Sequence, residues 1–183
     1  MPADESNPWQ TLARRLVYDN PWITVHEDRV IRPDGQEGIY GVVHYKNRAI
    51  GVLPVDDQGR IWLVGQYRYT LDRYSWEIPE GGAPEGEPAE DAARRELREE
   101  TGLSAAHLEP IARAHLSNSV SDEEAIIFRA TGLTAGTSQP EGTERLRVRL
   151  FEWCEAWGML SRGEITDSMT VIALLQEAVR RSG

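Results

Sequence analysis

Residues 81–103, GGAPEGEPAEDAARRELREETGL, restrict the fold of this chain more than any other stretch. A proline near its middle suits the first helical position, where a missing N–H has no partner to lose, and a glycine near its end suits the left-handed residue just past a helix. Between these two marks, apolar residues recur every four positions at Ala89, Ala93 and Leu97. The stretch therefore predicts a helix over 88–101, whose small alanines let it approach a sheet closely.

The same helix carries three glutamates close together, Glu96, Glu99 and Glu100. Residues three and four apart lie on one side of a helix, so the three carboxylates project together and repel each other unless a cation lies among them. Hard oxygen ligands on a rigid element suit Mg²⁺ or Mn²⁺. The ordinary alternative is a solvated charged face, which most charge runs form. We also expect Arg95 to hold the carboxylate of Glu99, four residues later, and Glu87 to anchor Arg95.

The rest of the chain alternates between short strands and helices. Alternating runs with turn residues predict antiparallel strands over 11–47, and more continuous apolar runs predict two central strands joined by a hairpin, at 49–55 and 60–69. Later strands are expected at 108–116, 124–130 and 145–153, a long loop at 131–144, and helices near 153–161 and 168–181. The pattern predicts an α/β or α+β fold in which a mixed sheet lies between helices. We divide the chain into a flexible tail at 1–10, a β domain at 11–47 and a main domain at 48–183.

The composition limits the partners of the chain. Its formal net charge is −10 and its pI is about 4.9, so neither nucleic acid nor an anionic membrane is an expected partner, because both need basic patches. The apolar runs are too short for a membrane span, the first ten residues lack the features of a signal peptide, and the single cysteine has no intrachain partner. We therefore expect a cytoplasmic protein. A small phosphate-bearing substrate stays open if a metal bridges the two negative partners.

The acidic stretch has the spacing G-x5-E-x7-R-E-L-x-E-E-x-G-L, formed by Gly81, Glu87, Arg95, Glu96, Leu97, Glu99, Glu100, Gly102 and Leu103. This spacing resembles the Nudix box of the Nudix hydrolases at every fixed position, and chance agreement at one start site is on the order of 10⁻⁹. Over about 11–180 the chain resembles the nucleoside-diphosphate-sugar branch, typified by ADP-ribose pyrophosphatases, including QYR at 66–68 and WEIPEGG at 76–82. The resemblance implies a Nudix-type α/β/α sandwich, preceded by a small antiparallel β extension.

The resemblance also implies a reaction and a set of metal ligands. The reaction is hydrolysis of a nucleoside diphosphate sugar to a nucleoside monophosphate and a sugar phosphate, with Mg²⁺ or Mn²⁺ as cofactor. Glu96 and Glu100 would be the main ligands, Glu99 a shared or bridging ligand that also counts among the catalytic glutamates, and the backbone carbonyl of Glu80 a further ligand. The glycine at 81 would permit the close backbone approach. The structural positions of the box would be Gly81, Glu87, Arg95 and Gly102.

In this branch the general base is a glutamate on a loop downstream of the box. Glu144 fits that place best and Glu141 is the runner-up, whereas Glu123 is a second candidate in the loop at 116–125. Relatives usually carry a proline in this last loop, where the present chain has Asn118. This departure puts strict ADP-ribose preference in question and makes another sugar, such as that of GDP-mannose, an alternative.

Substrate contacts are predicted for residues with suitable chemistry near the box and in the N-terminal strands. Arginines suit phosphate, a carboxylate suits a sugar hydroxyl or an arginine, and aromatic rings suit a nucleobase, although each also has an ordinary role on the surface or in the core. The candidates are Arg68, Arg73, Glu77, Trp22, Tyr69 and Trp76.

The strands over 11–47 are expected to pair with a second subunit, because exposed strand edges need cover, and the predicted assembly is a homodimer. Two other functions stay open. A house-cleaning pyrophosphatase for nucleoside triphosphates would be a shorter chain without these strands. A non-catalytic ligand-sensing domain of the same fold would commonly have lost glutamates of the box, and this chain keeps them all.

Overall fold

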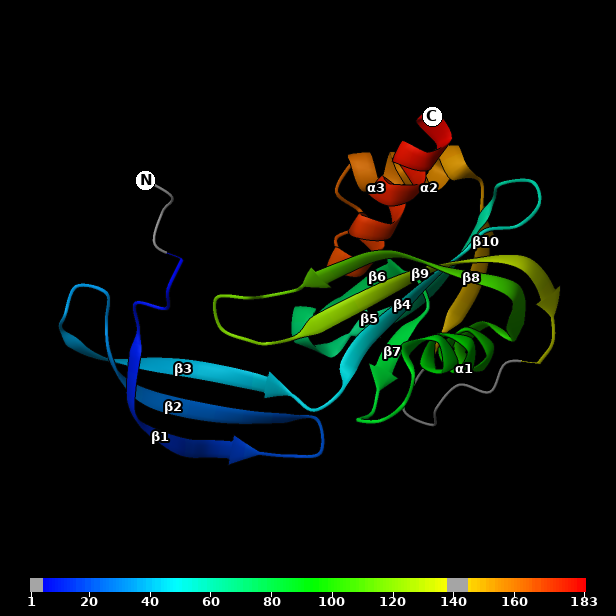
Figure 1. Ribbon diagram of the computed structural model, residues 1–183. Helices are drawn as coiled ribbons and strands as arrows, with labels where there is room; N and C mark the ends of the chain where they lie inside the picture. Colours follow the sequence, from blue (N-terminus) through cyan, green and yellow to red (C-terminus); the bar gives the residue numbers. More distant parts are fainter. Residues whose placement is uncertain (1–4, 138–144) are drawn as a thin grey trace. The chain divides into compact units, whose positions relative to one another are not determined.

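The computed structural model describes residues 5–137 and 145–183, which form two compact units (Figure 1). The first unit comprises Met1–Asn47 and His115–Glu123, and the second comprises Arg48–Ala114 and Glu124–Gly183. The sequence pattern did not assign the segment His115–Glu123 to the same unit as the N-terminal strands. Among the helices of the described residues, none combines the length and the apolar character needed to cross a bilayer.

The first unit is built on an antiparallel three-stranded sheet, as the alternating pattern predicts. Its strands are β1 (Gln10–Asp19), β2 (Ile23–Ile31) and β3 (Glu37–Tyr45), in the order β1-β2-β3. The turn between β1 and β2 is closed by Asn20, whose side-chain oxygen accepts the backbone N–H groups of Trp22 and Ile23, both at 2.8 Å. These two local bonds replace the hydrogen bonds between β1 and β2 where the chain reverses.

The segment 115–123 lies beside β3. The backbone N–H of Val43 donates to the carbonyl of Val120 at 2.8 Å, and Val43 forms a parallel bridge with Ser121. The side chains of His44 and Asp122 add a contact of 2.5 Å between Nδ1 and Oδ2. The segment is therefore held to the N-terminal sheet by backbone and side-chain bonds.

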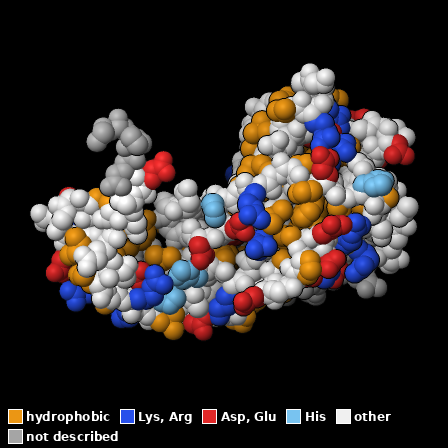
Figure 2. All heavy atoms as spheres, viewed as in Figure 1, with side chains coloured by type: hydrophobic (Ala, Val, Ile, Leu, Met, Phe, Trp, Pro, Cys, Tyr) orange, Lys and Arg blue, Asp and Glu red, His pale blue; other side chains and the backbone are white. Residues whose placement is uncertain are grey.

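Hydrophobic side chains remain exposed on the first unit, where Figure 2 shows them among charged groups. All of β1 is exposed. The most exposed large apolar residues of this unit are Leu16, Val17, Tyr18, Trp22 and Ile39.

The second unit contains two sheets, where the sequence pattern predicts one. The mixed sheet has the order β7-β4-β9-β8, with β4 (Arg48–Pro54) antiparallel to β7 (Glu80–Ala83) and parallel to β9 (Glu124–Ala135), and β8 (Leu103–His115) at one edge. The antiparallel sheet has the order β10-β5-β6. Its strands are β5 (Ile61–Arg68), β6 (Arg73–Glu77) and β10 (Arg147–Phe151), with the short 3-10 helix η1 (Tyr69–Leu71) before β6.

The predicted hairpin between 49–55 and 60–69 is wrong in its pairing. The connection is a tight turn, in which the N–H of Asp56 donates to the carbonyl of Arg60 at 2.9 Å. The two runs are joined by an isolated antiparallel bridge between Val55, just after β4, and Ile61 of β5, and β4 and β5 form no ladder among the described residues. Both strands are largely buried. Each finds its partners in a separate sheet: β4 pairs with β7 and β9, and β5 pairs with β6 and β10.

Other boundaries also differ from the sequence prediction. The strand β9 continues to Ala135, into the predicted loop at 131–144, and β8 begins at Leu103 instead of 108. The glycine at 132 causes the first error. It lies inside β9 with a left-handed φ of 64°, and a Cβ there would lie 2.7 Å from that of Ala106, so it marks an irregularity within the strand and not the start of a loop. The strands β6 and β7 were not predicted.

The three helices cover both sides of the sheets of the second unit (Figure 1). The helix α1 (Ala89–Thr101) contacts β4 and β7, whereas α3 (Ser168–Ser182) contacts β4 and β9, and α2 (Trp153–Ser161) lies on the side of α3. This layering confirms the α/β/α arrangement. The last helix is fixed by Glu177, a side chain only 2% exposed that accepts from Arg129 Nε at 2.7 Å and Arg181 Nε at 2.9 Å.

The helix α1 matches its prediction with two corrections. Pro88 is the N-cap, with φ −60° and ψ 137°, and not the first helical residue. Gly102 is left-handed at φ 73° and donates its N–H to the carbonyl of Arg98 at 2.9 Å, as predicted. The apolar stripe is shifted, because Ala92 is fully buried with Ala93 and Leu97 whereas Ala89 is only partly buried at the edge of the core.

Candidate active site

The burial of α1 carries two of its glutamates inward. Glu96 is 9% exposed and Glu100 is 3% exposed, one helical turn apart, whereas Glu99 is half-buried on the flank. The apolar residues between them pack into the core and hold this side of the helix against β4 and β7. The glutamates are therefore not the solvated face that charge runs usually form. Burying carboxylates is costly unless bonds or charges compensate them.

Gly81 makes room for the Glu96 carboxylate. A Cβ built on this glycine would overlap the carboxylate carbon and both its oxygens. The neighbouring backbone is bonded to the same helix, because the carbonyl of Gly82 accepts from Arg95 Nη2 at 2.9 Å. The strand β7 and the helix α1 therefore approach each other more closely than a residue with a Cβ at position 81 would allow.

Arg95 joins the acidic groups of α1 to the segment before the helix. It donates to the two oxygens of Glu87 at 3.1 and 2.9 Å, to Glu96 at 2.6 Å and to Glu99 at 3.2 Å. These bonds, Glu87 first, raise the pKa of the Arg95 guanidinium and lower the pKa of Glu87. The ion pairs expected between Arg95 and both Glu87 and Glu99 are thus present, and the arginine offsets part of the negative charge.

Glu100 contacts the backbone at the start of β7. Its Oε2 accepts the backbone N–H of Glu80 at 3.1 Å. The next residue back, Pro79, accepts through its carbonyl from the N–H of Val52 at 2.8 Å. A buried carboxylate of the helix and the backbone at 79–80 therefore have a fixed mutual position.

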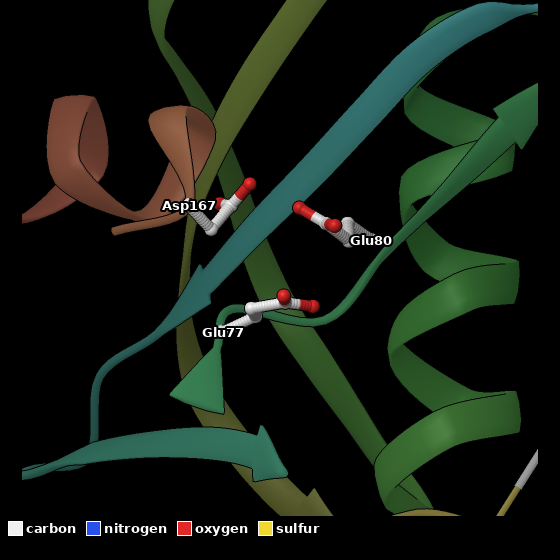
Figure 3. Close-up of side chains that lie close together, drawn as sticks. All are labelled: Glu77, Glu80 and Asp167. Carbon is white, nitrogen blue, oxygen red and sulfur yellow. The ribbon is translucent and has the colours of Figure 1, made fainter. Parts of the chain in front are cut away.

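A second acidic group lies at the other side of this segment. Figure 3 shows the carboxylates of Glu77, Glu80 and Asp167 turned toward a common space, from the end of β6, the start of β7 and the N-cap of α3. One oxygen from each lies within 4.8 Å of the others. Arg68 bonds two of the three, through Nε to both oxygens of Glu77 at 3.0 and 2.9 Å and through Nη2 to Glu80.

The charges of this cluster are unequally compensated. Burial, followed by the charges of Asp167 and Glu77, raises the pKa of Glu80 well above its usual value. Burial lowers the pKa of Arg68, but the bonds to Glu77 and the charge of Glu80 outweigh it and raise the pKa overall. One guanidinium faces three carboxylates, so the cluster has an excess of negative charge.

The carboxylate oxygens of α1 and of the cluster at Glu77, Glu80 and Asp167 fit a hard divalent cation. Carboxylate oxygens are the ligands that Mg²⁺ and Mn²⁺ prefer, and backbone packed beside a side-chain-free glycine can approach an ion closely. One oxygen of Glu80, Oε2, is buried and has no hydrogen-bond partner in the part of the chain that the structure describes. A buried acceptor without a partner costs free energy that a cation would recover.

Comparison with protein families assigns the fold. The NUDIX domain model matches residues 45–169, and a model described as the nucleoside diphosphate sugar hydrolase N-terminal domain matches residues 9–43. The chain is a Nudix hydrolase. It belongs to this family over more than half of its length, and the resemblance of its acidic stretch to the Nudix box is confirmed.

Full-length relatives support the same assignment. An ADP-ribose pyrophosphatase of Mycobacterium tuberculosis is 31% identical over 171 residues, which cover 91% of this Nudix hydrolase and 82% of the relative. An ADP-ribose pyrophosphatase of Bacillus subtilis is 31% identical over 177 residues, which cover 93% and 95%. A crystal structure of an ADP compounds hydrolase superposes with a TM-score of 0.83 at 20% identity and covers 96% of both chains, which confirms the fold.

Three of the residues predicted to contact substrate are bonded to or packed against other side chains of this Nudix hydrolase. Glu77 is 2% exposed and pairs with Arg68, one of its two predicted roles. Arg73 bonds the hydroxyl of Thr166. The ring of Trp76 packs edge-on against Phe151, with centroids 5.0 Å apart.

The two other predicted aromatic contacts are exposed. Tyr69 is 93% exposed in η1, and Trp22 is 67% exposed in the first unit. Their roles toward a substrate stay predictions.

The general base is not identified by these contacts. Glu141 and Glu144 lie outside the described residues. Glu123 belongs to the first unit, at the end of the segment 115–123. Each therefore stays a candidate.

Sequence reasoning missed the carboxylates of Glu80 and Asp167 and the hydroxyl of Thr170. The sequence held a signal for Asp167 and Thr170. Asp167 stands three residues before Thr170 at the start of an apolar helix, which is an N-cap pattern. The prediction for Glu80 considered only its backbone carbonyl. No local pattern links 77–80 to residue 167, because 87 residues separate Glu80 from Asp167 along the chain.

Proposed function

We propose that this Nudix hydrolase cleaves the pyrophosphate bond of a nucleoside diphosphate sugar, with a divalent cation at the glutamates of α1. The products would be a nucleoside monophosphate and a sugar phosphate. The observation that carries the proposal is the buried pair Glu96 and Glu100, held against the start of β7 at Glu80 and Gly81. The first strands of the same chain match the nucleoside diphosphate sugar hydrolase N-terminal domain. The relatives named ADP-ribose pyrophosphatase point to the same substrate class.

The chain's own residues would prepare the site in defined ways. Glu96 and Glu100 would be the main metal ligands, with Glu99 shared between ions and the carbonyl of Glu80 as a further oxygen. Arg95 restricts the carboxylates of Glu96 and Glu99 through its bonds at 2.6 and 3.2 Å. A divalent cation bound there would screen the phosphate charges and lower the pKa of a bound water.

The acidic surroundings explain why the substrate needs a cation. Two glutamates of the helix and the cluster at Glu77, Glu80 and Asp167 would repel a bare pyrophosphate. Arg68 lies in this cluster and carries a fork of donors suited to a phosphate, so we keep it as the first candidate for a substrate contact. A glutamate would accept the proton of the attacking water, and Glu144, Glu141 and Glu123 are the candidates.

The choice of sugar would come from residues outside the box. Asn118 lies in a turn in which the carbonyl of Ser117 accepts from the N–H groups of Val120 and Ser121 at 3.1 and 2.9 Å. The segment carrying this turn is bonded to β3, so it has a defined conformation in the first unit. Both ADP-ribose and GDP-mannose are therefore included as substrates to test.

The test is a substrate panel assayed with and without Mg²⁺ or Mn²⁺. ADP-ribose, GDP-mannose and UDP-glucose would be compared with a nucleoside triphosphate by kcat/KM and by product analysis. We expect metal-dependent release of a nucleoside monophosphate and a sugar phosphate from at least one of the sugars. Turnover of the triphosphate alone would favour a house-cleaning enzyme, and binding without turnover of any compound would favour a sensing domain.

We also propose a homodimer formed through the first unit. The exposed apolar residues of β1 support it, as does the edge position of this strand in the order β1-β2-β3 of the described residues, because both favour cover by a partner in water. Light scattering of the purified chain should give twice the mass of 20.6 kDa. The substitution Leu16→Glu should reduce that mass, and a monomeric wild-type chain would rule the dimer out.

The acidic chain with one cysteine is assigned to the cytoplasm.

A further inference from the structure

The first turn of α3 is bonded to the segment that contacts Glu100. Thr170 is fully buried, and its Oγ1 accepts the backbone N–H of Ile78 at 2.9 Å. The same hydroxyl donates to Asp167 Oδ2 at 2.7 Å, and that oxygen also accepts the Thr170 N–H at 2.7 Å. A hydroxyl has one hydrogen to donate, so these two bonds fix its orientation.

The packing of neighbouring side chains holds the hydroxyl of Thr170 beside the backbone N–H of Ile78. The side chains of Met169 and Ile78 meet over Gly51 of β4, where a Cβ would lie 2.7 Å from an atom of each. Both side chains are buried, at 4% and 0% exposure. The helix α3 is also tied to β9 through Glu177, which holds the helix against the sheet at a second point.

The backbone from 78 to 80 is held at three consecutive points. The N–H of Ile78 donates to Thr170, the carbonyl of Pro79 accepts from Val52, and the N–H of Glu80 donates to Glu100. The second bond comes from β4 of the mixed sheet and the third from the box helix α1. The first comes from a hydroxyl of α3, which belongs to neither. Loss of that hydroxyl would leave a buried N–H unsatisfied and free one end of the segment.

We propose that Thr170 is a positioning residue for the metal centre, acting through the Ile78–Glu80 backbone on the ligand Glu100. This proposal rests on the proposed function, because it assumes that Glu100 binds the cation. The hydroxyl contacts the backbone N–H of Ile78 and the carboxylate of Asp167, and it would not itself be a metal ligand. It fixes the distance between the start of β7 and the carboxylate of α1, and a metal site is sensitive to such outer contacts.

The test compares Thr170→Val, which keeps the shape and removes the hydroxyl, with Thr170→Ser, which keeps the hydroxyl. Mn²⁺ affinity of the substrate-free protein would be measured by calorimetry or by electron paramagnetic resonance. We expect about tenfold weaker Mn²⁺ binding for the valine variant, at the lower end of the range for residues that support metal ligands, and wild-type binding for the serine variant. The metal concentration for half-maximal activity should rise in parallel, with KM for the substrate at saturating metal unchanged.

A second variant of α3 separates positioning from simple destabilisation. Ala173 lies in the second turn of α3, so Ala173→Gly lowers helix stability without touching the Ile78 bond. It should bind Mn²⁺ like the wild-type protein. Equal weakening by Ala173→Gly and Thr170→Val, or wild-type binding by Thr170→Val, would overturn the positioning role.

The serine variant keeps the test decisive if the valine variant does not fold. Weak Mn²⁺ binding by a folded Thr170→Ser protein would contradict the proposal, and wild-type binding would support it. Failure of the wild-type chain to bind Mn²⁺ at all would instead refute the proposed function, and the positioning role with it.

Discussion

Gly81 and the carboxylate of Glu96 lie so close together that a Cβ on the glycine would overlap the carboxylate. Gly81 is not one of the described glycines with a left-handed φ. The reason for a glycine at this position is therefore space and not backbone angle. The first glycine of the box makes room for a side chain of the helix, in addition to any approach of the backbone to a metal.

Gly81→Ala should therefore weaken the metal site. The added methyl group displaces the Glu96 carboxylate, which also loses part of its contact with Arg95. We expect Mn²⁺ affinity and kcat/KM to fall by about 10- to 100-fold, the range seen when support of a metal ligand is lost. Both would be measured on the purified variant by calorimetry and by steady-state kinetics.

A matched glycine gives the control for this substitution. Gly41 has open space around its added Cβ and no left-handed φ. Gly41→Ala should leave both measurements at the wild-type level. Wild-type Mn²⁺ affinity in Gly81→Ala would show that Glu96 accommodates the methyl group and that the close contact is dispensable.

Glu100→Gln should lower kcat/KM by several orders of magnitude. The amide keeps the shape of the side chain and an oxygen for the Glu80 N–H, but it removes the negative charge that a divalent cation requires. Glu90→Gln in the same helix is the control, because Glu90 is exposed and pairs with Arg94 on the surface of the helix. Near-normal kcat in Glu100→Gln would mean that this residue is not a metal ligand.

Local patterns predicted most elements of this fold. The helix α1 was expected from its apolar spacing and its glycine end, and α2 and α3 from their apolar runs. The ion pair of Arg95 with Glu87 was also accessible, because both ends lie close together in the sequence. These features depend on contacts within one helix or across one short turn.

Long-range pairing was not accessible in the same way. The sequence of β4 and β5 shows two buried strands but not that each joins a different sheet, because any apolar strand satisfies the pattern for both. The cluster of Glu77, Glu80 and Asp167 depends on docking of α3 beside the start of β7. The segment 115–123 joins β3 through backbone bonds, which carry no residue signature.

Arg95→Gln should destabilise the protein and make it more responsive to metal. The substitution leaves Glu87, Glu96 and Glu99 without their common cation, so we expect a loss of about 2 kcal/mol in the free energy of unfolding. Mg²⁺ should recover part of this loss, because it neutralises the same carboxylates. Urea unfolding with and without Mg²⁺ would measure both effects.

The control for Arg95→Gln is Arg98→Gln, an exposed position of the same helix. Its effect should stay within about 0.5 kcal/mol, as for most surface substitutions. An equal loss in both variants would show that the general charge of the helix matters and not the bonds of Arg95.

The pair Asp28 and Arg14 should make the first unit sensitive to acid. Asp28 is 4% exposed and accepts from Arg14 Nε and Nη2 at 2.8 and 2.7 Å, and these bonds lower its pKa below the usual 3.8. Because the folded-state pKa lies below the unfolded-state value, the stabilisation is complete above that value and is lost as the pH falls through the folded-state pKa. Asp28→Asn should therefore reduce the free energy of unfolding at pH 7, and its difference from the wild type should shrink below about pH 4. Denaturant unfolding at pH 7, 5, 4 and 3 measures this, with the exposed Asp57→Asn as control, and a difference that grows on acidification would contradict the pairing.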